Sequence, residues 1–214
     1  MKIAIAGGHG KIALLLTRRL ETSGEEVVSL IRNPAHAADV EAAGGEPMVL
    51  DLEDAGVDEI TAALAGVEAI VFAAGAGPGS GNARKETVDF GAAAKLVDAG
   101  VRLGVARYVM VSSMGADPEH EGEETFDIYL RAKGRADAAL IESGLDYIVV
   151  RPGMLTDDQG TGRVRLGPVV PRGEIPRDDV AEVLFASLRR AAPSNLVFAV
   201  VSGDTPIPEA VDSA

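Results

Sequence analysis

The 214-residue sequence contains no cysteine and no tryptophan, and only 4% of its residues are aromatic. The absence of cysteine excludes disulfide bonds and thiolate metal sites, and it is typical of proteins in a reducing cytoplasm. No apolar run approaches the roughly 20 residues that a membrane-spanning helix needs. The apolar start MKIAIAG reaches glycine too early for a signal peptide. We therefore expect a cytoplasmic protein with no membrane partner.

Basic residues are few, because 20 Lys and Arg stand against 33 Asp and Glu, giving a formal net charge of −13. This charge argues against a nucleic-acid partner, which would require a basic face. A loop of backbone N–H groups can still hold a phosphate in an acidic protein. Only five of the basic residues are lysines, so each lysine is informative. The three histidines, His9, His36 and His120, lack ligand spacing, and we predict no metal site.

Short apolar runs alternate with amphipathic stretches, and glycine and proline mark their ends. Continuous Val/Ile runs separated by helices indicate parallel strands buried on both faces. We therefore predict one α/β domain over 1–214, a single doubly wound (Rossmann-like) parallel sheet flanked by helices. The predicted strands are 2–7, 25–33, 47–54, 68–77, 106–116, 145–153 and 195–203, and the predicted helices are 11–24, 34–45, 57–67, 82–100, 126–144 and 179–191.

The segment 154–177 interrupts this alternation. It is rich in glycine and proline and lacks strong periodicity, although GRVRLG (162–167) could form a short strand. Long irregular segments in compact domains are usually functional or mobile. We predict that 154–177 is an irregular, substrate-covering region, while the tail after 203 is weakly specified.

The stretch AGGHGKIA (6–13) connects the first predicted strand to the first predicted helix. Glycines let the backbone approach a ligand, and a helix N-terminus offers free N–H groups and a positive dipole end to a phosphate. A plain strand–helix turn is the alternative. Two spacings are possible, Gly8-x-Gly10-x-x-Ala13 and Gly7-x-x-Gly10-x-x-Ala13. We favour the second and interpret the first as a coincidence of two adjacent glycines.

The end of the second predicted strand indicates which dinucleotide is bound. NAD-preferring folds commonly place Asp or Glu there, to bind the ribose 2′-hydroxyl, whereas this sequence has Arg32 followed by Asn33. An arginine can pair with the 2′-phosphate of NADP, and no carboxylate stands beside it in the sequence to repel that phosphate. We therefore predict NADP rather than NAD. A solvated surface arginine is the alternative.

Two further loops follow predicted strands. Asp51 could bind the adenine amino group, with Leu52 packing on the ring, or it could be an ordinary turn or N-cap aspartate. The loop FAAGAGPG (72–79) consists of small residues after its first position, so Ala74 and Gly75 could pass close to the ribose and nicotinamide. The same small residues could simply cap a buried strand.

Tyr129 and Lys133 lie four positions apart, on one face of a predicted helix. A phenol can donate a proton to a carbonyl as hydride arrives, if a nearby ammonium lowers its pKa. Chance would produce such a pair about 0.07 times in this composition. Ser112 and Ser113 could orient the substrate. Alternatively, Tyr129 packs on the sheet and Lys133 binds only the cofactor ribose.

These stretches resemble the short-chain dehydrogenase/reductase superfamily, and more narrowly its small atypical NmrA-like and biliverdin-reductase-B-like branch. The resemblance covers nearly the whole chain and is carried by AGGHGKIA, LIRNP, DLED, YVMVSSMGAD, YLRAKGRADAALIESGLDYIVVRPG and EIPRDDVAEVL. With it, the candidate cofactor-binding residues are Gly7, Gly8, His9, Gly10, Lys11, Ile12, Arg32, Asn33, Asp51, Leu52, Ala74, Gly75, Lys133 and Pro152. The candidate catalytic residues are Tyr129, Lys133, Ser112 and Ser113.

The resemblance implies an NADPH-dependent reductase, a monomer or homodimer, that transfers hydride to a small quinone, flavin or carbonyl acceptor. Only about 60 residues follow RPG (151–153), whereas the related sugar-nucleotide epimerases carry a large C-terminal substrate domain. Met154, Leu155, Val164 and Leu166 would cover the acceptor. A non-catalytic NADP(H) sensor of NmrA-like type is the alternative, and an epimerase or dehydratase is a third interpretation.

Overall fold

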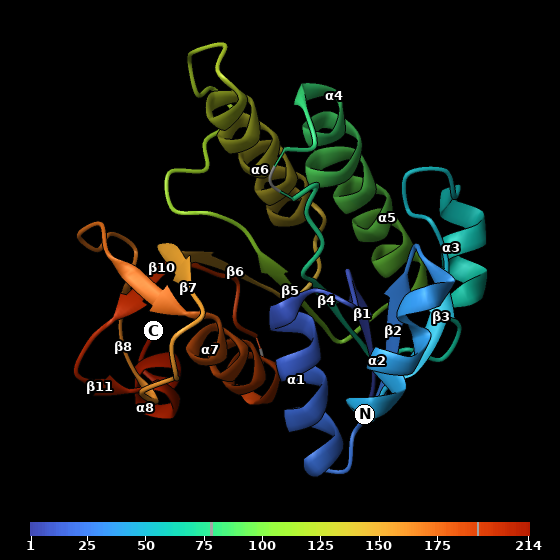
Figure 1. The fold of residues 1–214 in the computed structure, drawn as a ribbon, viewed down its shortest axis with the longest axis horizontal. Helices are drawn as coiled ribbons and strands as arrows, with labels where there is room; N and C mark the ends of the chain where they lie inside the picture. The colour runs from blue at the N-terminus through green and yellow to red at the C-terminus, as the bar shows by residue number, and fades with distance from the viewer. Residues whose placement is uncertain (78, 192) are drawn as a thin grey trace.

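The computed structural model describes residues 1–77, 79–191 and 193–214. Within these ranges a nine-stranded sheet has the order β11-β8-β10-β6-β5-β4-β1-β2-β3, and helices cover both of its faces (Figure 1). The strands from β10 to β3 are all parallel, whereas β8 and β11 join the edge in antiparallel pairs. The predicted doubly wound α/β fold is therefore confirmed, with an added antiparallel edge.

The central strands are buried on both faces, which explains why their sequences are continuous runs of Val, Ile and Ala rather than alternating patterns. Each of the seven predicted strands is present, with bounds a few residues shorter than expected. The strands of the sheet are β1 (Lys2–Ala6), β2 (Glu26–Ile31), β3 (Glu46–Val49), β4 (Ala69–Phe72), β5 (Arg107–Val111), β6 (Tyr147–Pro152), β8 (Arg163–Gly167), β10 (Leu196–Ser202) and β11 (Thr205–Pro206).

Two helical layers enclose two apolar cores (Figure 1). Leu16 and Leu184 lie in the core on one face, and Leu96 and Leu140 lie in the core on the other. No helix within the described ranges is long and apolar enough to cross a bilayer. The first layer holds α1 (Lys11–Thr22), α7 (Arg177–Arg189) and α8 (Ile207–Asp212), and the second holds α3 (Val57–Ala63), α5 (Ala93–Leu103) and α6 (Thr125–Glu142).

The predicted helices 34–45 and 82–100 differ from expectation in detail. The first is a 3₁₀ turn, η1 (Pro34–His36), followed by the short helix α2 (Ala37–Ala42). The second begins with α4 (Asn82–Arg84), continues as a π-helix, η2 (Lys85–Ala92), and becomes α5 at residue 93. The spacing of apolar residues in the sequence cannot reveal a π-helix, because each π turn shifts the buried positions by only about one residue relative to an α-helix. Such segments occur frequently at functional sites.

The prediction that 154–177 is irregular is wrong for three short strands within it, while its substrate-covering role stays a prediction. Strands β7 (Met154–Thr156) and β9 (Glu174–Pro176) pair in parallel as a small second sheet, and GRVRLG forms β8 against β10. The tail after 203 forms β11 and α8. These elements are short, and they are specified by pairing with distant residues rather than by a local pattern, which explains why periodicity missed most of them.

Candidate functional site

The strand order reverses direction at β1, which lies between β2 and β4. At such a switch point the loops that follow adjacent strands leave in opposite directions, and a crevice opens at the carboxyl ends of the strands. A cavity of about 400 Å³ lies there. Ten of the predicted cofactor residues line it together: Gly7, Gly8, His9, Gly10, Arg32, Asn33, Asp51, Leu52, Ala74 and Gly75.

The glycine loop is closely packed on both sides. Gly7 has a φ of +77°, and a Cβ there would lie 2.6 Å from the Cα of Ala74. A Cβ on Gly8 would lie 2.5 Å from the Cβ of Ser29 in β2. β2 leaves no room for a side chain at Gly8, so packing requires a glycine there, and which of the two spacings describes the loop stays a prediction. Both adjacent glycines are needed to bring this loop against β2 and the loop after β4.

The first turn of α1 is open to an anion. Its N-cap is Gly10, which has no side chain to occupy the free N–H groups, and no acidic residue lies in the first turn. Ile12 and Ala13 are buried in the core, so Ile12 offers a ligand only its backbone N–H. Because free N–H groups and the positive end of the helix dipole converge there, this turn suits a pyrophosphate.

Lys11 connects the glycine loop to the C-terminal part of the chain. Its amine pairs with the carboxylate of Asp157, which also accepts a hydrogen bond of 2.7 Å from Arg177 Nη1. The hydrogen bond from Lys11 is the main influence that lowers the pKa of Asp157. Lys11 is not among the described residues that line the cavity, and its contact with pyrophosphate stays a prediction.

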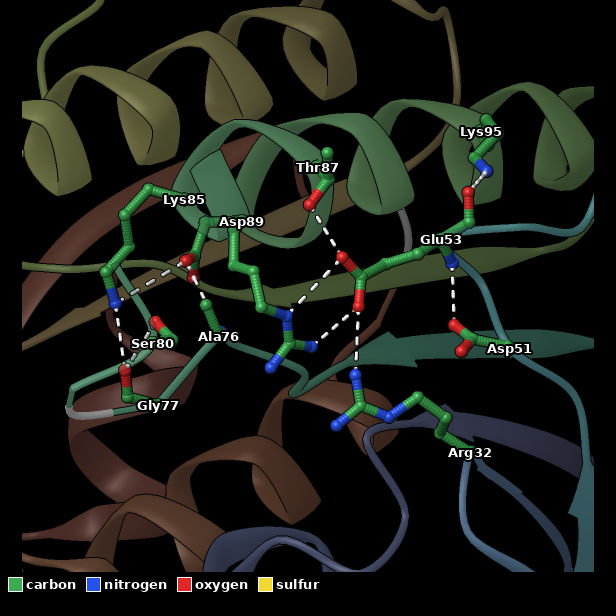
Figure 2. A network of polar contacts seen from close by, with 11 residues as sticks. Arg32, Asp51, Glu53, Ala76, Gly77, Ser80, Lys85, Thr87, Asp89 and Lys95 are labelled. Atoms are coloured by element: carbon green, nitrogen blue, oxygen red, sulfur yellow. Dashed lines mark hydrogen bonds and ion pairs between the residues drawn. The ribbon is translucent and has the colours of Figure 1, made fainter. Parts of the chain in front are cut away.

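A carboxylate does face Arg32, so the expectation that no acidic group would repel a phosphate there is wrong. Arg32 Nη1 donates to Glu53 Oε2 at 3.0 Å, and Arg84 Nη2 donates to the same oxygen at 2.6 Å. Thr87 donates to Glu53 Oε1 at 2.6 Å (Figure 2). Hydrogen bonding by Arg84 lowers the pKa of Glu53, so its carboxylate is charged at neutral pH. We call these four residues the Glu53 cluster.

The loop that carries Glu53 is held at its backbone. Asp51 Oδ1 accepts the N–H of Glu53 at 2.9 Å, and Lys95 Nζ donates to the carbonyl of Glu53 at 3.0 Å (Figure 2). Lys95 Nζ also donates to the carbonyl of Ala55, at 2.8 Å. Asp51 therefore has the turn role that we considered as an alternative. Leu52 packs into a core and lines the cavity. The contacts of Asp51 and Leu52 with adenine stay predictions.

Two histidines that are separated in the sequence meet at the cavity. The rings of His9 and His36 stack with centroids 3.6 Å apart, and His9 Nε2 lies 2.7 Å from Asp39 Oδ2. His120 lies instead beside Asp127, at 3.0 Å. In the part of the chain that the structure describes, no group of three or more His, Asp or Glu side chains is placed to hold a metal ion.

The predicted catalytic pair is arranged differently from expectation. Lys133 is buried, and its amine donates to the carbonyl of Val111 at 3.0 Å. The ammonium that lies over the Tyr129 ring is that of Lys85, 5.3 Å from the ring centroid. The partly exposed Tyr129 also stacks on Phe126, with centroids 5.9 Å apart. The role of Tyr129 as an acid stays a prediction, with Lys85 as the cation that faces its ring.

Asp89, in the π-helix η2, lies between the two buried lysines. Its carboxylate is fully buried, with Oδ1 at 3.8 Å from Lys133 Nζ and Oδ2 at 4.0 Å from Lys85 Nζ. Oδ2 accepts the N–H of Ala76 at 3.3 Å, and Lys85 donates to the carbonyl of Gly77 at 3.0 Å (Figure 2). Oδ1 accepts no hydrogen bond from any described residue. We call Asp89, Lys85 and Lys133 the Asp89 cluster.

Asp89 and Lys85 were not predicted from the sequence as site residues, unlike Lys133, although a signal was present. Two of the five lysines of the chain belong to the Asp89 cluster. The cluster holds η2 and α6 beside residues 76 and 77, at the end of the loop that lines the cavity. Pro78 of the predicted FAAGAGPG loop lies outside the described residues.

The predicted serines differ in exposure. Ser112 is buried, and its hydroxyl donates to Asp137 Oδ2 at 2.8 Å, where Arg151 Nε donates at 2.9 Å. Burial raises the pKa of Asp137. The half-buried Ser113 hydroxyl makes only a long contact of 3.4 Å, with the carbonyl of Met114. A substrate contact is therefore easier for Ser113 than for Ser112, and both stay predictions.

Three further predicted cofactor residues, Ile12, Lys133 and Pro152, are not among the described residues of the cavity wall. Pro152 ends β6, and its carbonyl accepts the N–H of Met114 at 3.0 Å. The Lys133 amine lies 3.8 Å from Asp89 Oδ1 and 5.3 Å from the centroid of the Phe72 ring, at the start of the 72–79 loop. Their direct cofactor contacts stay predictions.

Comparison with known proteins gives a consistent result. A family model described as NAD(P)H-binding matches residues 7–191. The protein named uncharacterized sugar epimerase YhfK, from Bacillus subtilis, is 37% identical over 212 residues, which are 99% of each chain. A Bacillus halodurans structure named for an NAD-dependent epimerase/dehydratase is 34% identical over the whole of both chains, with a TM-score of 0.92. The oxidoreductase ylbE from Lactococcus lactis is 27% identical, with a TM-score of 0.86, over 100% of this chain and 96% of that chain.

Proposed function

The chain belongs to the NAD(P)H-binding family, and from this premise we propose that it is a cytoplasmic NADPH-dependent reductase of a small acceptor. The observation that carries the proposal is the cavity at the β1–β4 switch point. The glycine loop and Arg32 both line it, and its wall continues through Ala76 to the Asp89 cluster.

The residues around the cavity fit a nicotinamide dinucleotide. Gly7 and Gly10 line the cavity beside the free N–H groups of α1, which suit a pyrophosphate, and Arg32 supplies a charge for a 2′-phosphate. Ala74 and Gly75 present no bulky side chain to a ribose or nicotinamide. When bound, the cofactor supplies a hydride, and the acceptor must also gain a proton.

We assign to Tyr129 the role of donating this proton when the acceptor is a carbonyl compound. Its ring is partly exposed, and the Lys85 ammonium lies 5.3 Å from the ring centroid. A positioned phenol can donate a proton to a carbonyl oxygen as the hydride arrives. A flavin or quinone acceptor would not require Tyr129. If the 154–177 segment covers the acceptor, its short strands β7 and β9 would form only a small cover, which favours a small or flat acceptor.

The test is to mix the protein with NADPH and a panel of quinones, flavins and aldehydes, and to follow the loss of nicotinamide absorbance. We expect turnover with at least one class. Tyr129→Phe should lower carbonyl turnover about 10²–10⁴-fold and leave quinone or flavin turnover unchanged. Tyr147→Phe, at the opposite end of the parallel strands in β6, is the matched control. Unchanged carbonyl turnover in Tyr129→Phe would remove the acid role.

The names of YhfK and of the Bacillus halodurans structure favour an epimerase or dehydratase as a second candidate. Such enzymes return the hydride to the substrate, so conversion of a nucleotide sugar without net NADPH consumption would support that candidate. Tight NADPH binding with neither activity would instead support a cofactor-sensing protein.

A further inference from the structure

We infer that Glu53 is a specificity-determining residue of the cofactor site, which weakens the binding of a 2′-phosphate at Arg32 and so keeps the preference for NADPH over NADH small. The inference rests on the proposed contact between Arg32 and that phosphate. It concerns a residue that was not predicted to bind the cofactor, because Glu53 meets Arg32 only in the folded chain.

The Glu53 carboxylate lies inside the site. Arg32, Glu53 and Arg84 all line the cavity, together with Asn33 and His36 from the same end. Glu53 Oε2 receives both guanidinium groups, at 3.0 Å from Arg32 and 2.6 Å from Arg84. The positive charge of Arg32, which would bind a 2′-phosphate, is therefore already paired with the Glu53 carboxylate.

The carboxylate is also the fixed member of this group. Arg84 and Thr87 hold its two oxygens, while Asp51 and Lys95 hold its backbone. Its side chain is only 20% exposed, whereas that of Arg32 is 55% exposed. An incoming phosphate can therefore attract the Arg32 side chain, but Glu53 stays beside it.

The electrostatic consequence depends on the cofactor. A 2′-phosphate carries close to two negative charges at neutral pH, so it is repelled by Glu53 while it competes for Arg32. The 2′-hydroxyl of NADH carries no charge and can donate a hydrogen bond to a carboxylate. Removing the charge of Glu53 should therefore strengthen NADPH binding and leave NADH binding unchanged or weaker.

The experiment measures the dissociation constants of NADPH and NADH for the wild type and for Glu53→Gln, which keeps the size and one acceptor oxygen of the side chain. We expect the NADPH/NADH affinity ratio to rise about tenfold, equivalent to about 1.4 kcal/mol, and the rise to shrink with added salt. Glu86→Gln is the matched control, because Glu86 also pairs with an arginine, Arg135, at 2.6 Å but is not among the described cavity residues. It should leave the ratio unchanged.

The inference would be overturned if the NADPH/NADH affinity ratio of Glu53→Gln fell or changed less than about twofold. An equal rise of the ratio in Glu86→Gln would overturn it too. Measuring the affinities of 2′,5′-ADP and 5′-ADP repeats the comparison with ligands that lack the nicotinamide. Thermal unfolding checks that each variant folds. Arg32→Ala separates the two claims. If it weakens NADPH selectively while Glu53→Gln has no effect, only the role of Glu53 fails. If it weakens both cofactors equally, the proposed 2′-phosphate contact fails, and the inference fails with it.

Discussion

The Glu53 and Asp89 clusters are two ways of placing a carboxylate among basic side chains near the same cavity. The π-helix η2 contributes to both, through Thr87 in one and through Lys85 and Asp89 in the other. Glu53 is partly exposed, and both of its oxygens accept hydrogen bonds. Asp89 is fully buried, and its Oδ1 lies opposite Lys133 without a hydrogen bond from any described residue.

This difference separates an adjustable site from a fixed one. Exposed ion pairs contribute little to stability and can be rearranged by a ligand. Buried ion pairs become very unfavourable once one partner is removed, because the remaining charge has neither water nor a counter-charge. We conclude that the Glu53 cluster is suited to selecting a ligand, whereas the Asp89 cluster fixes η2, α6 and the 73–77 loop in one arrangement.

The largest effect should come from removing Asp89. Asp89→Ala leaves Lys85 and Lys133 buried without their carboxylate and should lower the free energy of unfolding by about 3–5 kcal/mol. Glu53→Ala should lower it by only about 1 kcal/mol or less, as expected for a partly exposed pair. Urea unfolding followed by circular dichroism measures both values.

Equal losses in the two variants would remove the distinction between a fixed and an adjustable cluster. Asp89→Asn keeps the shape of the side chain and should be less destabilising than Asp89→Ala. If Asp89→Ala does not fold, the same comparison can be made with Asp89→Asn and Glu53→Gln. The unfolding midpoint of Asp89→Asn should then fall further below that of the wild type than the midpoint of Glu53→Gln does.

A smaller effect should appear in the pH dependence of Glu53. Its pKa is lowered from the ordinary value of 4.5, so its charge stabilises the folded state above that pH and loses this contribution as the pH falls through the folded-state pKa. The difference in unfolding free energy between the wild type and Glu53→Gln should therefore shrink as the pH falls below 4.5. A difference that grows on acidification would show that the carboxylate is not stabilised in its charged form.

Much of the fold could be predicted because its signals are local. Val/Ile runs gave the parallel strands, and glycine and proline gave the ends of most helices. Parallel strand order then places the residues after each strand on one edge, which explains why Gly7, Arg32, Asp51 and Ala74 indeed line one cavity.

The features that were not predicted depend on contacts between residues that are far apart in the sequence. Glu53 follows Arg32 by 21 positions, and the path of α4 and η2 brings Arg84 and Thr87 to it. The pairing of Lys85 and Lys133 around Asp89 likewise depends on how η2 packs against α6. Strands β7 and β9 are three residues each and form only because they meet each other.

The central claim is that this cavity binds NADPH through the charge of Arg32. Its most direct test is a calorimetric titration of the wild type and Arg32→Ala with NADPH and with NADH. Arg102→Ala is the control, because Arg102 is an exposed arginine paired with Asp58 and is not among the described cavity residues. We expect Arg32→Ala to weaken NADPH binding by about 1–3 kcal/mol and to change NADH binding less than about twofold. Equal weakening of both cofactors, or the same loss in Arg102→Ala, would contradict this claim.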